Sequence, residues 1–107
     1  MDKNQKHKYT SRAKIIKSMA HPTRLLIIDE LAKGERCVNE LTEMVGDDKS
    51  TVSKHISVLK NAGLLEDDKR GASIYYKLKC PCVTQYFDCI EQVLKRNSKD
   101  YLKAIGG

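Results

Sequence analysis

One stretch, residues 50–79, constrains the fold more than any other part of this chain. It begins with a run in which Val52, Ile56 and Leu59 recur at helical spacing, with hydroxyl and lysine side chains between them. Ser50 stands where the N-cap of such a helix is expected. The turn residues Asn61–Gly63 follow, so the helix is predicted to be short and to carry a small, polar outer face.

Two strand-like runs follow this turn. They are Leu64–Glu66 and Ser73–Leu78, and the segment Asp67–Ala72 between them has the Gly and Asp content of a hairpin turn. A short helix with a small polar face, followed by a hairpin, is the outline of a winged helix-turn-helix. It makes duplex DNA the first partner to consider.

The rest of the chain predicts helices, so the expected fold class is mainly α with a small β-hairpin. Apolar residues at helical spacing mark residues 10–19, 22–32, 38–45 and one long last helix from residue 81 onward. The basic segment 1–9 lacks this pattern and is predicted to be a flexible arm. Residues 10–104 then form one winged-helix domain for DNA binding and dimerisation.

Length and composition fit this organisation. A single domain of 107 residues buries a modest share of its surface, so association into an oligomer would stabilise it. No apolar run approaches a membrane span, and the N-terminal residues lack the apolar core of a signal peptide. We therefore expect a cytoplasmic protein whose four cysteines are reduced thiols, ligands or redox sensors.

The charge is unevenly distributed. The net charge is +6, but residues 1–24 carry seven basic and one acidic side chain, residues 25–48 two and seven, and residues 49–79 seven and three. Basic ends around an acidic middle would place positive surfaces where phosphates lie, although an ordinary solvated surface has the same signature.

Four ordered motifs resemble the ArsR/SmtB family of winged-helix repressors. They are Met19–Leu25, Glu35–Leu41, Val52–Leu59 and Ala62–Leu65, and the resemblance extends over residues 16–95. It implies a homodimer whose first and last helices pair across a two-fold axis. It also implies binding to a double-stranded operator and release when an inducer binds, without a cofactor for DNA binding itself.

The polar face of the fourth helix and the tip of the hairpin are the predicted DNA contacts. Small hydroxyl groups allow close approach to bases, whereas Lys54 and Lys60 suit phosphates. His55 has two interpretations, a base contact or a partly buried, hydrogen-bonded histidine. The predicted DNA-binding residues are Ser50, Thr51, Ser53, Lys54, His55, Ser57, Lys60, Lys69 and Arg70.

The cysteines are the candidate inducer site. Arsenic-sensing members of the family carry two cysteines separated by one residue. Here Cys37 occupies the first of these positions and Asn39 the second, so that motif is incomplete. The zinc-sensing branch has Asp and His ligands on the last helix, and this chain has no histidine after His55. Cys80 and Cys82 offer substitutes, because a short strand before the third helix would bring Cys37 near them, within one protomer or across the dimer. Three thiolates suit As(III) or Sb(III), with Cd, Pb or Zn as further options.

Other interpretations remain open at this point. Oxidation or persulfide chemistry linking Cys37 to Cys80 or Cys82 would make a redox-responsive repressor. Cys89, on the apolar face of the last helix, is predicted to be a small core residue. A winged-helix protein-interaction module without DNA binding is a further alternative. No catalytic triad, phosphate loop or complete zinc motif points to an enzyme.

Overall fold

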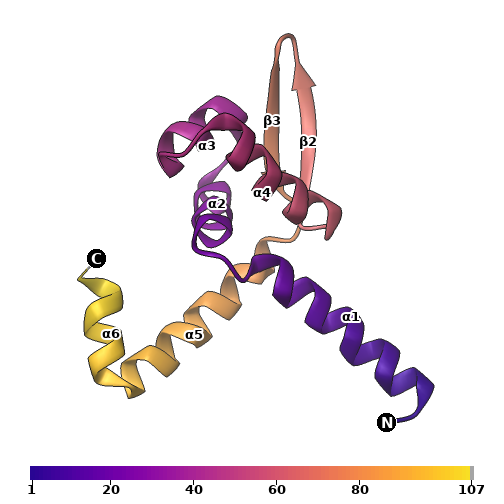
Figure 1. The fold of residues 1–107 in the computed structure, drawn as a ribbon, viewed down its shortest axis with the longest axis vertical. Helices are drawn as coiled ribbons and strands as arrows, with labels where there is room; N and C mark the ends of the chain where they lie inside the picture. Colours follow the sequence, from indigo (N-terminus) through magenta and orange to yellow (C-terminus); the bar gives the residue numbers. More distant parts are fainter. Residues whose placement is uncertain (107) are drawn as a thin grey trace.

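The fold is an array of helices with one small sheet (Figure 1). The computed structural model describes residues 1–106, except for the side chains of residues 98, 100 and 101. Its elements are α1 (Lys3–Met19), α2 (Pro22–Lys33), β1 (Arg36–Cys37), α3 (Val38–Val45), α4 (Lys49–Asn61), β2 (Leu65–Arg70), β3 (Ser73–Leu78), the 3-10 turn η1 (Pro81–Val83), α5 (Thr84–Arg96) and α6 (Ser98–Ile105). This order confirms the predicted winged helix-turn-helix. None of the described helices has the length and apolarity needed to cross a membrane.

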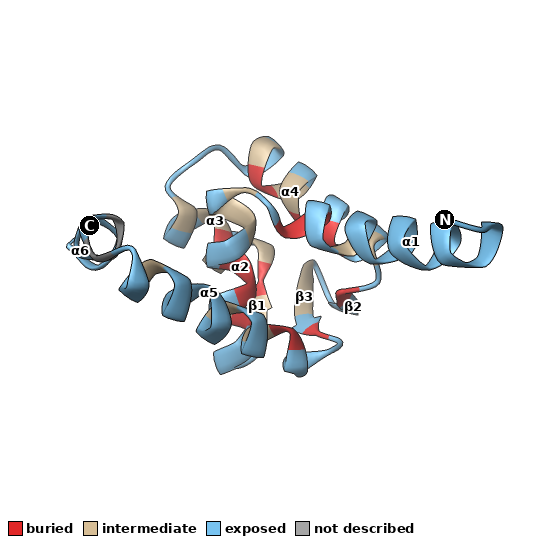
Figure 2. Ribbon diagram, turned by 90° about the horizontal axis from the view of Figure 1, so that it is seen from below, coloured by how far each residue is buried: buried red, intermediate tan, exposed pale blue. Residues whose placement is uncertain are grey.

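The core lies between α2, α3, α4 and the base of the sheet (Figure 2). Ile27 and Ile28 of α2 are fully buried, and so are the three apolar residues of α4 that set its predicted inner face. Leu65 and Leu78 close the core from the strands. Burying a side chain of this size stabilises the fold by about 1.5–3 kcal/mol, so these few residues fix the angle of α4 against the body.

The helix α4 begins earlier than predicted. Its N-cap is Asp48 rather than Ser50, and the Asp48 Oδ1 atom accepts a 2.7 Å hydrogen bond from the backbone N–H of Thr51. This bond lowers the pKa of Asp48, because it favours the ionised carboxylate. A carboxylate at this end also complements the positive end of the helix dipole. Ser50 therefore lies in the first turn, on the exposed side.

The N-terminal segment is helical from Lys3, so the predicted start at residue 10 was wrong. Asp2 and Gln5 form a capping box, in which Asp2 Oδ1 accepts from the Gln5 N–H at 2.8 Å and Gln5 Oε1 accepts from the Asp2 N–H at 3.2 Å. Two otherwise unpaired backbone donors are satisfied in this way, which starts a helix without an apolar stripe.

The sheet has three antiparallel strands in the order β1-β3-β2. The strand β2 continues to Arg70, so the predicted six-residue turn was too long. Only Gly71 and Ala72 connect the strands, and Gly71 has a φ of +62°, which suits a two-residue hairpin turn. Backbone pairing with β3 holds Asp67 and Asp68 in a strand despite their low strand propensity.

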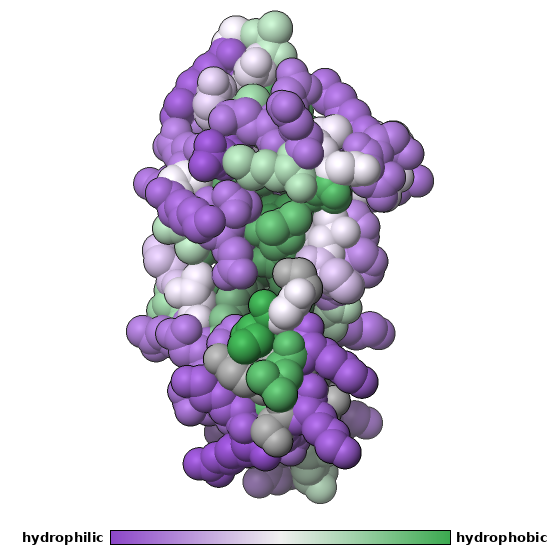
Figure 3. All heavy atoms as spheres, turned by 90° about the vertical axis from the view of Figure 1, so that its left-hand side faces the viewer, coloured by the Kyte–Doolittle hydropathy of each residue, from purple (hydrophilic) through white to green (hydrophobic). Residues whose placement is uncertain are grey.

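The predicted single last helix is divided. Asn97, with φ −97° and ψ 67°, ends α5, and α6 begins one residue later. None of the α5 residues is buried, although Tyr86, Ile90 and Val93 lie along it. Hydrophobic side chains form a strip on the side of the molecule where α5 and α6 lie (Figure 3). Phe87 of α5 packs against the core, whereas the residues that the structure describes leave Tyr86, Ile90 and Val93 exposed.

Candidate nucleic-acid interface and thiol residues

The outward side of α4 carries short polar and basic groups. Lys49, Ser50, Lys54 and Ser57 are exposed, and Thr51 and Ser53 are half-buried. The opposite side is anchored by the buried apolar residues of the same helix. A rigidly held helix with hydroxyl groups and lysines outward has the shape and chemistry that a major groove accepts.

His55 lies at the junction of α4 with α2. Its Nδ1 atom accepts a 3.3 Å hydrogen bond from the Arg24 Nε–H, and its ring centre is 4.3 Å from that of His21. Burial lowers the pKa of His55, and the charges of His21 and Arg24 lower it further. His55 therefore acts as a neutral acceptor between two helices, which is the second of the two interpretations given above.

Lys60 connects α4 to the hairpin. Its Nζ atom lies 2.7 Å from Asp67 Oδ2, and this hydrogen bond raises the pKa of Lys60 and lowers that of Asp67. This lysine, predicted to contact phosphate, therefore forms an exposed ion pair with the hairpin, and such a pair contributes little to stability.

The two basic residues of the hairpin tip lie on opposite faces of β2. Arg70 stacks on Tyr75 at 4.6 Å and pairs with Glu35 at 2.7 Å and with Asp68 at 2.9 Å. Lys69 points to the other face and is exposed, with no ion pair to any residue that the structure describes. Of the two DNA contacts predicted at the hairpin tip, Lys69 is available to a phosphate, whereas Arg70 is engaged by carboxylates of the same chain.

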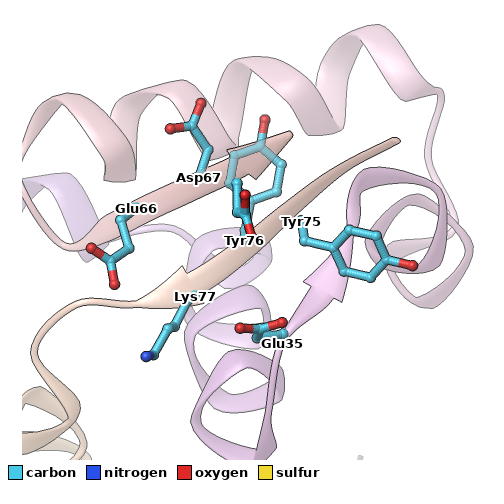
Figure 4. A pocket seen from close by; sticks show the side chains of 7 residues that line it. Glu35, Glu66, Asp67, Tyr75, Tyr76 and Lys77 are labelled. Atoms are coloured by element: carbon cyan, nitrogen blue, oxygen red, sulfur yellow. The ribbon is translucent and has the colours of Figure 1, made fainter. Parts of the chain in front are cut away.

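Carboxylates surround the Arg70 face of the hairpin. A hollow of about 200 Å³ is lined by Glu35, Glu66, Asp68 and tyrosine side chains, and Figure 4 shows Glu35 beside β3 in this hollow. Lys77 also lines this hollow, and the carboxylates offset the positive charges of Lys77 and Arg70 on this face. The predicted phosphate contact of Arg70 therefore competes with its pairing to Glu35 and Asp68.

The four thiols are free and differ in exposure. Cys37 is buried, whereas Cys80, Cys82 and Cys89 are exposed. The backbone N–H of Cys37 donates a 3.1 Å hydrogen bond to Glu40 Oε1, which lowers the pKa of that carboxyl. The prediction that Cys89 is a core residue was wrong for the single chain, because the side of α5 that carries it is uncovered.

Cys37 does not approach Cys80 or Cys82 within one chain. A short strand does precede α3 and pairs with the wing, as expected, but its register places Cys37 opposite Tyr75. Cys80 lies five residues beyond Tyr75 and two beyond the end of β3 at Leu78, so the sheet pairing does not extend to it. No group of three metal-ligating side chains occurs among residues 1–106 where side chains are described.

The sequence analysis missed two residues that hold the DNA-binding elements in position, Asp48 at the start of α4 and Glu35 beside the hairpin. Asp48 was recognisable as a capping residue three positions before Thr51, but Ser50 offered a competing N-cap. Glu35 carries no local signal, since its role depends on a partner 35 residues away.

A groove with apolar walls lies between α1, α2 and α5. Its lining includes Ile16, Leu25, Tyr86 and Ile90, and its volume is about 170 Å³. Ile16 is 50% exposed, Tyr86 57% and Ile90 52%, in a chain with a small core. Large exposed apolar patches on small domains mark association surfaces.

Comparison with known proteins agrees with the fold. Residues 21–67 match the model of the bacterial regulatory protein, arsR family. The HTH-type transcriptional regulator NmtR of Mycobacterium tuberculosis is 38% identical over 76 residues, which are 71% of this chain and 63% of NmtR. The match thus spans less than two thirds of that relative's length.

Two further similarities extend over more of the chain. The HTH-type transcriptional regulator Rv0081 of Mycobacterium tuberculosis is 30% identical over 93 residues, which are 86% of this chain and 82% of the relative. A solved structure of Mb0332 from Mycobacterium bovis, described as a homodimeric winged helix-turn-helix DNA-binding domain, superposes with a TM-score of 0.77 at 27% identity, over 92% of each chain.

Proposed function

The chain belongs to the ArsR/SmtB family of winged-helix regulators, and on this premise we propose that it is a homodimeric repressor that binds operator DNA. The outward side of α4 carries this proposal. Lys49, Ser50, Lys54 and Ser57 are exposed on it, while the inner side is held by the core. Structural support of this kind suits insertion into a groove.

The homodimer follows from the uncovered apolar side chains of α1 and α5. A second copy that covers them would bury the residues that one chain leaves exposed. The same pairing would set the distance between the two α4 helices, and thus the spacing of the two operator half-sites.

We propose that a thiol-binding inducer releases the DNA. Cys80 and Cys82 are exposed between β3 and α5, at the join of the hairpin and the dimerisation helix. Because the described residues of one chain form no group of three metal ligands and Cys37 pairs with Tyr75, the third thiolate of a site for As(III) or Sb(III) would come from the second copy. Redox or persulfide chemistry at the exposed thiols is the alternative. The exposure of three cysteines supports this alternative as much as it supports metalloid binding.

DNA binding is tested by titrating random duplex DNA with the reduced protein at several salt concentrations. We expect a steep loss of affinity with salt and a weaker affinity for Lys54→Ala, because α4 then loses a phosphate contact. Lys99→Ala, an exposed lysine of α6, is the matched control. A flat salt response would contradict the DNA-binding proposal and favour a protein-interaction module.

The inducer is tested anaerobically by adding As(III) to the protein–DNA complex and counting free thiols. We expect As(III) to release DNA from the wild type and from Cys89→Ser. The Cys80→Ser/Cys82→Ser variant should bind DNA normally and keep it when As(III) is added. If As(III) has no effect but a mild oxidant or polysulfide releases the DNA, the redox alternative holds.

A further inference from the structure

A basic hollow lies where α1, α2 and α4 meet. It has a volume of about 420 Å³ and is lined by Lys14, Lys17, Ser18, Arg24, Val58, Asn61 and Ala62. None of these residues belongs to the predicted DNA contacts of α4 and the hairpin. Val58, Asn61 and Ala62, at the C-terminal end of α4, contribute to the lining, so the hollow adjoins that helix.

Three cations line this hollow without a carboxylate. Lys14, Lys17 and Arg24 form no ion pair with any residue that the structure describes, whereas Lys33, Arg36, Lys60 and Arg70 all do. The carbonyl end of α4 carries about half a negative charge, which three full positive charges outweigh. The hollow is therefore electropositive.

Arg24 has unused donors in a fixed position. Its Nε–H donates to His55 at 3.3 Å, and one of its terminal N–H groups donates to the Ser18 carbonyl at 2.9 Å. A guanidinium has five N–H donors, so three remain. Two helices hold this planar group in place, and such a group matches the oxygens of a phosphate.

The hollow stays open when α1 takes part in a dimer. Lys14, Lys17 and Ser18 are spaced three and four residues apart and share one face of α1. Ile16 and Met19, which line the apolar groove, lie on the opposite face. The two hollows share no lining residue, so covering the groove with a second copy leaves the cations accessible.

We infer that this hollow binds a backbone phosphate of the DNA, beyond the base pairs that α4 contacts. This inference rests on the proposed DNA binding and extends the contact surface from α4 and the hairpin to α1 and α2. Each protomer would neutralise one further phosphate. Because a phosphate contact carries no base information, it would raise affinity for all sequences alike.

The test compares two variants of α1 with equal charge loss. Lys14→Gln/Lys17→Gln removes cations from the hollow, and Lys3→Gln/Lys6→Gln removes the same charge from the distant end of the helix. Affinity for random duplex DNA is measured against salt concentration. With two hollows per dimer and a slope of about 0.9 per phosphate, we expect the hollow variant to lower the slope by about 1.8 and the control to retain it.

The outcomes separate this inference from the proposed function. A wild type that binds DNA while both variants retain its slope overturns the phosphate site and leaves DNA binding intact. An equal drop in both variants overturns it too, since general charge on α1 would then suffice. A wild type that does not bind DNA overturns both.

A second measurement distinguishes DNA phosphate from a free phosphorylated molecule. Inorganic phosphate is titrated at constant ionic strength, and the NMR signals of the Arg24 Nε–H and the Asn61 side-chain amide are followed. We expect small shifts that duplex DNA abolishes by competition and that Lys14→Gln/Lys17→Gln lacks. Phosphate binding that persists unchanged on the protein–DNA complex would assign the hollow to a free ligand and overturn the inference.

Discussion

Replacing Ile90 by alanine should weaken the homodimer without unfolding the monomer. Ile90 lies on α5 beside the apolar groove and is 52% exposed in the single chain, so a partner can bury about half of the side chain. Full burial of an isoleucine contributes about 1.5–3 kcal/mol, so this half is worth about 1 kcal/mol. Two-fold symmetry repeats the loss, giving about 2 kcal/mol for the dimer.

A loss of this size raises the dissociation constant about 30-fold. Sedimentation equilibrium over a range of concentrations measures it directly. Met44→Ala is the matched control, because Met44 is an apolar residue of α3, 40% exposed and outside the groove. The reasoning is refuted if Ile90→Ala associates as tightly as the wild type, or if Met44→Ala weakens association to the same extent.

Three further predictions concern single contacts. Asp48→Ala should lower the urea midpoint of unfolding, whereas Asp48→Asn retains most of the N-cap and should stay close to the wild type. Because the pKa of His55 is lowered in the folded state, the unfolded chain takes up this proton first, so stability is lost as pH falls below about 6.5. In His55→Gln the melting temperature should fall less than in the wild type between neutral and mildly acidic pH. An unchanged pH dependence would contradict the assignment of this loss to His55. Glu35→Gln should remove one of the two carboxylates that pair with Arg70 and tighten DNA binding more than Glu91→Gln does, with little change in stability, because the Glu35–Arg70 pair is exposed.

The helices were predictable because the buried side of a helix places apolar residues in the sequence at helical spacing. Val52, Ile56 and Leu59 are three residues of one face, and all three are buried as their spacing indicated. The wing was recognisable from Gly71 and the flanking strand-like runs, but its length was not. The four charged residues Asp67–Arg70, which were assigned to the turn, are held in β2 by pairing with β3, and their own strand propensities do not predict this pairing.

The thiol residues show where sequence reasoning ends. The topology was predicted correctly, since β1 lies beside β3. The register was not, because a two-residue strand has no alternating pattern to define its alignment. A shift along β3 decides whether Cys37 faces Tyr75 or approaches Cys80, and tertiary packing alone sets it.

The pairing of β1 with β3 also bears on the order in which the chain folds. Cys37 and Tyr75 close a loop of about 38 residues that contains α3, α4 and β2. Closing a flexible loop of that length costs about 3 kcal/mol in chain entropy, whereas two residue pairs supply few contacts in return. We therefore expect α3 and α4 to pack on α2 first, which shortens the gap that β1 must close. The strand β1 would then join the sheet last in folding and be the first to open in native-state hydrogen exchange.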